Sequence, residues 1–341
     1  MQRSQALTIV LLSAVICVTS CAAAPEQPYS HEAWAESQHP PSDMGPLPAG
    51  CKAVRYDGGF IPIKQTVTPS GQHCVVHDFV QRRKIDVITR SKTGSPGCDG
   101  ILSFYEGSNV DLDLRGHLVS GVPFDDTVGI LANDKYTDLR VHDGKVVTPG
   151  SSGIGVFLAR YQAPPQRQPK YMAPEDLPPM RSKNYDVKTK AFLYSDPWDY
   201  QPPTHYTAEN LTIQSGGRGI IMSGADNVIR NNIIEVDGKV AVYMYGPRPV
   251  IEGNTFIVKL DANDKATLPA MLKLRDADGA IIRNNRFIVK SGPFGTRQAE
   301  AAINLLASKN VLIENNIVQD TRQLVRKDEA STTLERGNQL K

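Results

Sequence analysis

The chain has 341 residues, of which 38 are Lys or Arg and 36 are Asp or Glu, so its formal net charge is +2. This balance gives no electrostatic case for nucleic acid as a partner, while 40% hydrophobic residues suffice for a buried core. Glycine and proline are too few for a collagen-like or low-complexity protein. The composition therefore indicates a globular chain.

The first residues predict a signal peptide. Arg3 precedes an apolar run from Ala6 to Val18, which is too short to span a bilayer comfortably. The run ends in Val18-Thr19-Ser20-Cys21, and this motif resembles the bacterial lipoprotein signal, in which small residues precede a lipidated cysteine. The resemblance implies that residues 1–20 are removed and that acyl chains on Cys21 form a membrane anchor.

This anchor implies a location in the cell envelope. The residue after Cys21 is Ala22 and not the aspartate that is associated with inner-membrane retention, so the resemblance favours the outer membrane, facing the periplasm or the cell surface. An ordinary cleavage site near Ala22 to Ala24 is the alternative. Residues 21–49 are rich in proline and are expected to form an extended tether.

Two segments in the first half of the chain predict β-strands. Residues 109–121 alternate polar and apolar side chains, with Val110, Leu112 and Leu114 toward one side. Residues 139–146 contain a polar pair, Asp143-Gly144, between two β-prone runs. Residues 161–204 then interrupt the strands as a Pro- and Tyr-rich insertion, which is long enough to be functional or disordered.

The second half of the chain contains internal repeats. Four segments share a short β-prone run, a polar pair and a second β-prone run, at residues 228–234, 250–256, 281–287 and 312–318. A further strand precedes each segment, and no segment has enough apolar surface to fold alone. Stacking the repeats at the inter-strand spacing of roughly 4.8 Å would build one continuous core.

With these repeats and the segment Asn-Val-Asp-Leu-Asp-Leu-Arg-Gly-His-Leu at 109–118, the chain resembles the right-handed parallel β-helix superfamily typified by pectate lyases. The resemblance covers about residues 68–320. It implies an all-β fold, a single-stranded right-handed parallel β-helix or solenoid, which we place at residues 50–320. Residues 321–341 are expected to form a C-terminal cap or tail that covers the open sheet edge.

The resemblance also implies a structural ladder at one bend of the coil. Its members would be the second residues of the polar pairs, Asn232, Asn254, Asn285 and Asn316. Side-chain amides at the β spacing can hydrogen-bond to the coils before and after. These asparagines are therefore expected to be structural and not catalytic.

Three cysteines remain after Cys21. Cys74 and Cys98 are 24 residues apart, close to the length of one repeat, so they are expected to lie on neighbouring coils and form a disulfide. Export permits such a bond. Cys51, near the tether, is then the unpaired thiol, and no Cys or His spacing indicates a zinc site.

A candidate substrate site follows from strand alternation. Tyr243 and Tyr245 are expected to lie beside Lys273 and Arg275 on adjacent coils, as an outward aromatic and basic patch. Aromatic faces stack on sugars, and Lys and Arg bind carboxylates. Pectate-lyase-like enzymes remove the proton α to a uronate carboxylate, so the resemblance implies Arg275 or Lys273 as base and Tyr245 as acid. Trp198 and Tyr200 of the insertion are added as substrate-binding residues. A solvated strand face is the alternative.

Other polar groups carry weaker signals. A cluster of Asp111, Asp113, Arg115 and His117 could serve acid–base or calcium chemistry, but the segment resembles the ordinary structural repeat. Asp125-Asp126 resembles the paired aspartates of polygalacturonases, whose companion motifs are missing, and the alginate epimerase signature is absent too. Asp261, Asn263 and Asp264 could hold calcium, although a turn explains them equally. The sequence shows no evident metal site and no evident cofactor. Calcium is the one ion that these acidic groups could bind.

Two functional hypotheses follow. The first is a cell-envelope lipoprotein that binds or processes polysaccharide as its partner, with an acidic glycan lyase or epimerase as the specific enzyme expected. The second is a noncatalytic β-helix lipoprotein with a structural role or an interaction with protein or glycan. The fold resemblance favours the first hypothesis, and the missing catalytic signatures favour the second.

Overall fold

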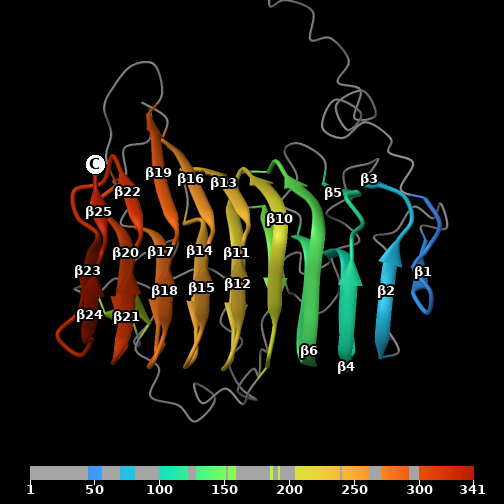
Figure 1. Cartoon of the computed structure of the whole chain (residues 1–341), viewed down its shortest axis with the longest axis horizontal. Helices are drawn as coiled ribbons and strands as arrows, with labels where there is room; N and C mark the ends of the chain where they lie inside the picture. Colours follow the sequence, from blue (N-terminus) through green and yellow to red (C-terminus); the bar gives the residue numbers. More distant parts are fainter. Residues whose placement is uncertain are drawn as a thin grey trace, which may run out of the picture.

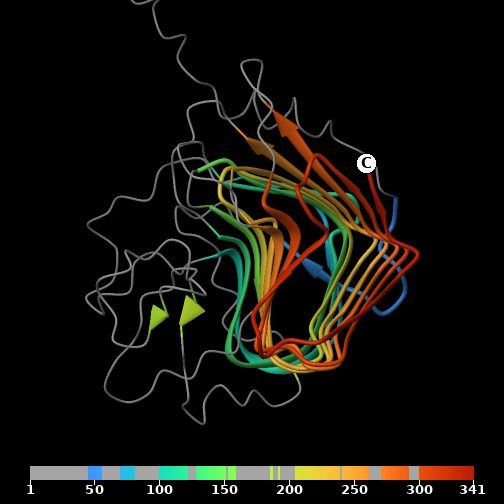
Figure 2. The same cartoon turned by 90° about the vertical axis from the view of Figure 1, so that its left-hand side faces the viewer.

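The computed structural model describes residues 45–55, 70–80, 100–121, 128–150, 153–158, 185–186, 191–192, 204–238, 240–260, 270–291 and 299–341. These residues contain strands and no helix, and strand after strand pairs in parallel with the strand one coil earlier (Figure 1). Seen along its axis, the chain winds into a coil of superimposed strands (Figure 2). The coil has three sheet faces.

The first face runs through the early parts of β4 (Gly100–Asp113) and β6 (Val128–Thr148) and continues coil by coil. Its other strands are β7 (Ile154–Leu158), β11 (Arg218–Ser223), β14 (Val242–Tyr245), β17 (Ala270–Arg275), β20 (Ala301–Leu306) and β23 (Val325–Lys327).

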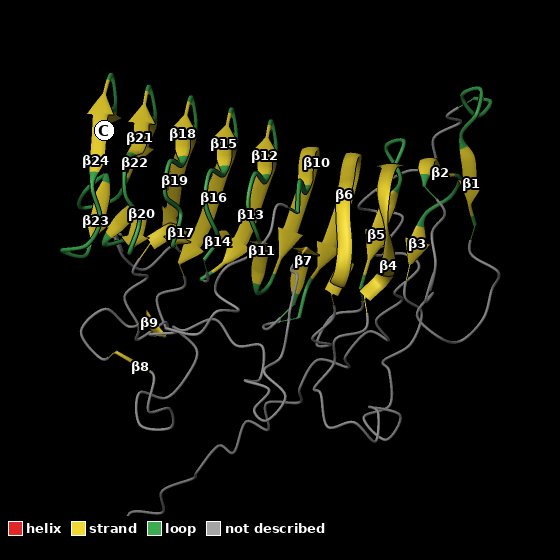
Figure 3. Ribbon diagram, turned by 90° about the horizontal axis from the view of Figure 1, so that it is seen from below, coloured by secondary structure: helices red, strands yellow, loops and turns green. Residues whose placement is uncertain are grey.

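The second face contains the longest strands and their short successors, which form a row in Figure 3. Its strands are β1 (Lys52–Val54), β2 (Gly71–Val75), β4 (Gly100–Asp113), β6 (Val128–Thr148), β10 (Thr207–Ser215), β12 (Val228–Arg230), β15 (Val250–Glu252), β18 (Ile281–Arg283), β21 (Val311–Glu314) and β24 (Thr333–Arg336).

The third face includes the late parts of β6 and β10. Its other strands are β3 (Phe79–Val80), β5 (Leu118–Ser120), β13 (Ile233–Asp237), β16 (Thr255–Leu260), β19 (Arg286–Ser291), β22 (Ile317–Gln319) and β25 (Gln339–Leu340). Apart from the coil, β8 (Tyr185–Asp186) and β9 (Ala191–Phe192) form a short antiparallel pair.

The core consists of apolar columns along the coil axis. Alternate residues of each strand point inward, so equivalent positions on successive coils stack on one another. On the second face Ile229, Ile251, Ile282 and Ile313 form one such column, and all four are buried. On the third face the rings of Phe256 and Phe287 stack at 4.9 Å. Burial of these columns is the main driving force for stacking one coil on the next.

The asparagine ladder is confirmed. Asn232 donates from Nδ2 to Oδ1 of Asn254 at 3.0 Å, and the same bond recurs from Asn254 to Asn285 and from Asn285 to Asn316. The ladder has a further member, because Asn316 donates to Asn338 at 3.0 Å. The residue before each ladder position has a positive φ of 55–68°, which Asn and Gly adopt readily, at Asn231, Gly253, Asn284, Asn315 and Gly337.

The C-terminal boundary differs from the expectation. Residues after 320 do not form a separate cap or tail, because β23, β24 and β25 pair with β20, β21 and β22 as a further coil. The repeat pattern did not reveal this coil, because its first strands carry Lys327 and Glu335 at positions that earlier coils fill with apolar side chains.

The disulfide also differs from the expectation. It joins Cys51 to Cys74, with the Cα atoms 5.9 Å apart, and not Cys74 to Cys98. The reason is that β1 forms a further coil before β2. It pairs with β2 in parallel and brings Cys51 next to Cys74. Cys98 lies outside the described residues, as do the signal segment, Cys21 and the insertion residues Trp198 and Tyr200. None of the described segments is a helix that is long and apolar enough to cross a membrane.

Candidate functional site

The second face carries two outward columns of side chains. They flank the inward column that contains Leu112, Val141, Ala208 and Ile229. The first outward column is Asp111, Arg140, Thr207, Val228, Val250, Ile281, Leu312 and Leu334; the second is Asp113, His142, Glu209, Arg230, Glu252, Arg283, Glu314 and Arg336. The two columns are polar at their N-terminal end, and this end forms the candidate site.

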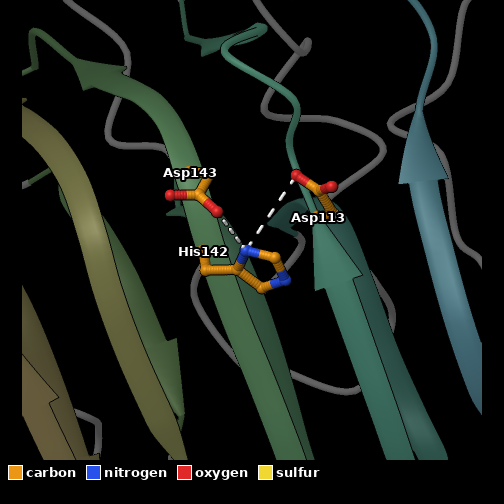
Figure 4. Close-up of side chains that lie close together, drawn as sticks. All are labelled: Asp113, His142 and Asp143. Atoms are coloured by element: carbon orange, nitrogen blue, oxygen red, sulfur yellow. Dashed lines mark hydrogen bonds and ion pairs between the residues drawn. The ribbon is translucent and has the colours of Figure 1, made fainter. Parts of the chain in front are cut away.

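His142 lies at the centre of the site, with the carboxylates of Asp113 and Asp143 near one ring nitrogen (Figure 4) and the carboxylate of Asp111 near the other. Its Nδ1 is 2.6 Å from Oδ2 of Asp143 and 4.0 Å from Oδ1 of Asp113, while its Nε2 is 3.0 Å from Oδ1 of Asp111. Strand β4 supplies Asp111 and Asp113, and β6, the next rung, supplies His142 and Asp143. The imidazole is 7% exposed and Asp143 is 49% exposed, so the group opens to solvent on the Asp143 side.

Arg140 and Glu209 extend this polar network along the face. The Arg140 guanidinium donates to Oδ1 of Asp111 at 3.0 Å and also to Glu209, which accepts from Arg230 as well. Burial opposes the charge on Arg140, but the hydrogen bonds and charges of Glu209 and Asp111 outweigh it and raise the pKa of this guanidinium. Arg140 is therefore a permanent cation, and its side chain is about half-exposed.

Charges alternate along the second column beyond Glu209. Arg283 donates to Glu252 at 2.9 Å and Arg336 to Glu314 at 2.7 Å, each across one rung. The arginine side chains remain accessible, with Arg230, Arg283 and Arg336 exposed by 49%, 41% and 64%. The face thus presents a row of guanidinium groups next to the cluster at His142.

The cluster expected from residues 111–117 is divided in the structure. Asp111 and Asp113 join the site at His142, but Arg115 donates to the carbonyl oxygen of Gly45 at 3.0 Å, and His117 lies 3.1 Å from Oδ1 of Asp78. The strand ends at Asp113, and Arg115 and Gly116 have φ values of 51° and 75°. This turn ends the alternation that was expected to keep the four side chains on one face.

The patch expected on the first face is assembled but is not open to solvent. Register pairs Tyr243 with Lys273 and Tyr245 with Arg275, as predicted, and Lys273 Nζ lies 5.9 Å from the centroid of the Tyr243 ring. However, Lys273 is only 1% exposed, and Tyr243 and Arg275 are 8% and 9% exposed. The patch continues a buried apolar cluster on the outside of the coil, which includes Leu131, Phe157 and Ile221. The roles of these residues in substrate binding and catalysis stay a prediction.

Sequence reasoning missed Arg140, His142, Asp143 and Glu209 as site residues. One signal was available: residues 139–146 match the repeat, which places His142 at the outward position before the bend. His142 and Glu209 are 67 positions apart in the sequence, and the insertion between them hid the next coil. Asp113, His142 and Asp143 are also the residues that could hold a metal ion, since their ligand atoms lie within 4.8 Å of one another. The other acidic positions considered, 125–126 and 261–264, lie outside the described residues.

Comparisons with known proteins bear on the fold. No curated protein matches the sequence. Among solved structures, the chain is similar to the enzymatically active domain of tailspike protein 2 from bacteriophage CBA120, with 12% identity and a TM-score of 0.40. The match covers 80% of this chain and 38% of the tailspike chain, so this chain spans less than half of that relative. A family model described as a right-handed beta helix region matches residues 201–339, and the chain folds as a right-handed parallel β-helix.

Proposed function

We propose that the protein binds or processes an acidic polysaccharide on the second face of the coil. One observation carries this proposal: the face that holds the group around His142, which opens to solvent at Asp143, also holds the half-exposed arginines Arg140, Arg230 and Arg283. A linear polyanion can follow a flat face of this kind over several rungs, and guanidinium groups pair well with carboxylates.

The group around His142 supplies the means for proton transfer. The half-exposed carboxylate of Asp143, which contacts the imidazole of His142, can accept a proton from a sugar carbon or hydroxyl and return it, provided that the substrate reaches hydrogen-bond distance. Asp143 is the most exposed member and holds Nδ1, while Arg140 can compensate the charge of a uronate. We therefore infer that an acidic glycan lyase or epimerase reaction takes place beside the half-exposed Asp143 and not at Lys273, which is 1% exposed.

The noncatalytic alternative is supported by a different observation. Arg230, Arg283 and Arg336 of the second column each have a carboxylate partner on the preceding coil. These ion pairs can therefore serve stability alone. In that case the face would bind protein or glycan without turnover, or only stiffen the coil.

We propose further that the protein is a lipoprotein of the cell envelope, because of the motif at residues 18–21. Substitution of Cys21 by Ser should leave the protein unprocessed or release it from membranes in cell fractionation. If the variant is processed and fractionates with membranes as before, Cys21 does not carry the anchor.

The functional proposal is tested by incubating the protein with a panel of polyuronates and neutral glycans. Binding, unsaturated product and chain length are recorded for the parent, for His142→Ala and for the control His205→Ala. His205 is a half-exposed histidine that also contacts an aspartate, Asp138 at 2.8 Å, at the bend before the second face. We expect binding or turnover of a polyuronate that is reduced in His142→Ala only. Equal behaviour of all three proteins on every glycan would contradict the proposal.

A further inference from the structure

The contact between His142 and Asp143 requires either a hydrogen or a cation between the two atoms. Nδ1 of His142 and Oδ2 of Asp143 are 2.6 Å apart, and Oδ1 of Asp113 is 4.0 Å from the same nitrogen. A ring nitrogen with a free lone pair would repel both carboxylates. A proton on Nδ1 or a bound cation removes this repulsion. The geometry therefore fits either a hydrogen bond from His142 to Asp143 or a metal ion between them.

The surroundings of the other ring nitrogen are compatible with a metal ion at Nδ1. Nε2 of His142 is buried and forms no well-aligned hydrogen bond within the described residues, but Oδ1 of Asp111 lies 3.0 Å away. Arg140 donates to this same Asp111 oxygen and holds it in place. A histidine that binds a metal through one nitrogen commonly directs its other N–H at a carboxylate, which fixes the tautomer and the ring orientation. Asp111 is placed for that role.

We propose that Asp113, His142 and Asp143 bind a divalent transition-metal ion, through Oδ1, Nδ1 and Oδ2. The three ligand atoms lie within 4.8 Å of one another, so one ion can reach all three once the side chains move to ligand distances of about 2.0–2.2 Å. Small shifts of Asp143, which is half-exposed at the bend after the strand, are enough to adjust the distances. This proposal deepens the proposed function, because it assigns a metal to the same site.

The donor set indicates the class of ion. One imidazole nitrogen and two carboxylate oxygens suit Zn²⁺ or a similar first-row ion, whereas Ca²⁺ takes six to eight oxygen ligands. Three protein ligands leave at least one coordination position free for water or a substrate oxygen. Because Asp143 faces solvent, a carboxylate or hydroxyl of a glycan could reach that position.

The test is a titration of the full, tag-free protein with Zn²⁺ after treatment with chelator, followed by calorimetry. We expect one zinc ion per chain in the parent. Asp143→Asn should remove this binding, and Asn tolerates the φ of 55° at this position, so the variant keeps the bend. Asp111→Asn should weaken binding about 10–100-fold, as changes behind a metal-binding histidine do. Absorption of a Co²⁺-loaded sample gives a second readout of nitrogen and oxygen ligation.

The control is His205→Ala, which should bind zinc like the parent. Zinc binding that is equal in the parent, Asp143→Asn and His142→Ala, or no zinc binding by the parent, would overturn the proposal and leave a hydrogen bond between His142 and Asp143. Preference for Ca²⁺ over Zn²⁺ would overturn the assigned ion class. The zinc titration contains no glycan, and glycan binding can be measured on the chelator-treated protein, so the metal site and the proposed function can fail separately.

Discussion

Oδ1 of Asn285 accepts two hydrogen bonds from Asn254, one from the side-chain Nδ2 at 3.0 Å and one from the backbone N at 2.9 Å. Asn285 in turn donates to Asn316 in the same way and to the carbonyl oxygen of Ile251. A single buried amide therefore connects three successive coils, and its removal leaves polar groups without partners on both sides.

Replacement of Asn285 by Leu should lower the free energy of unfolding by about 1–3 kcal/mol, because buried donors and acceptors lose their partners. Denaturant unfolding measures the effect. The matched control is Lys290→Leu on the next strand, where the side chain is half-exposed. Equal stability of the two variants would show that the ladder contributes nothing.

The bond between Cys51 and Cys74 should be found by mass mapping of non-reduced peptides. Cys51→Ser should lower the free energy of unfolding by about 2–4 kcal/mol, since the bond closes a loop of 23 residues at the N-terminal end of the coil. Cys98→Ser serves as the control and should have a smaller effect. A peptide that joins Cys74 to Cys98 would refute the assignment.

Because the patch on the first face is buried, its mutation is expected to affect the stability of the protein and not glycan binding. The double substitution Lys273→Ala and Arg275→Ala should lower the melting temperature, because both side chains are packed and Arg275 is paired with Asp276 at 3.1 Å. It should leave glycan binding by the folded protein unchanged. If the variant melts like the parent but binds polyuronate more weakly, the patch is accessible and is itself the binding site.

Glu209 should make stability dependent on pH. Burial favours a higher pKa for this carboxyl, but hydrogen bonds from Arg140 and Arg230 outweigh burial and lower its pKa below the ordinary value of 4.5. A lowered pKa means that the ionised group stabilises the fold above pH 4.5 and that this contribution is lost as the pH falls through the folded-state pKa.

The difference in the free energy of unfolding between the parent and Glu209→Gln should therefore be largest near pH 6 and shrink below pH 4.5. Glu335→Gln, at an exposed position of the last coil, is the control and should follow the parent at each pH. A difference that stays constant from pH 6 to pH 3 would contradict the inferred ion pairs.

The fold could be predicted from the sequence because its determinants repeat. The Asn at each bend and the alternate apolar residues recur at each coil, so Asn232 and Ile229 identify their equivalents at Asn254 and Ile251. Register on the first face followed from the same alternation, as the pairing of Tyr243 with Lys273 confirms.

The features that could not be predicted from the sequence depend on contacts that do not repeat from coil to coil. The sequence could not show that Lys273 is buried, because alternation tells only which side of the sheet a residue faces and not what covers that side. The site at His142 was missed because its partners come from coils of unequal length. Cys51 was misjudged because β1, a strand of three residues, carries no pattern of its own.

The proposal that the second face recognises an acidic polysaccharide is tested most directly by measuring the affinity of this face for a polyuronate. Arg230→Gln with Arg283→Gln should weaken binding about tenfold and reduce its salt dependence, since two half-exposed guanidinium groups are removed from the face. The control, Lys259→Gln with Lys290→Gln, removes two half-exposed cations from the third face and should bind like the parent. Unchanged binding by the arginine variant, an equal loss in the control, or no polyuronate binding by the parent would contradict the claim that this face recognises an acidic polysaccharide.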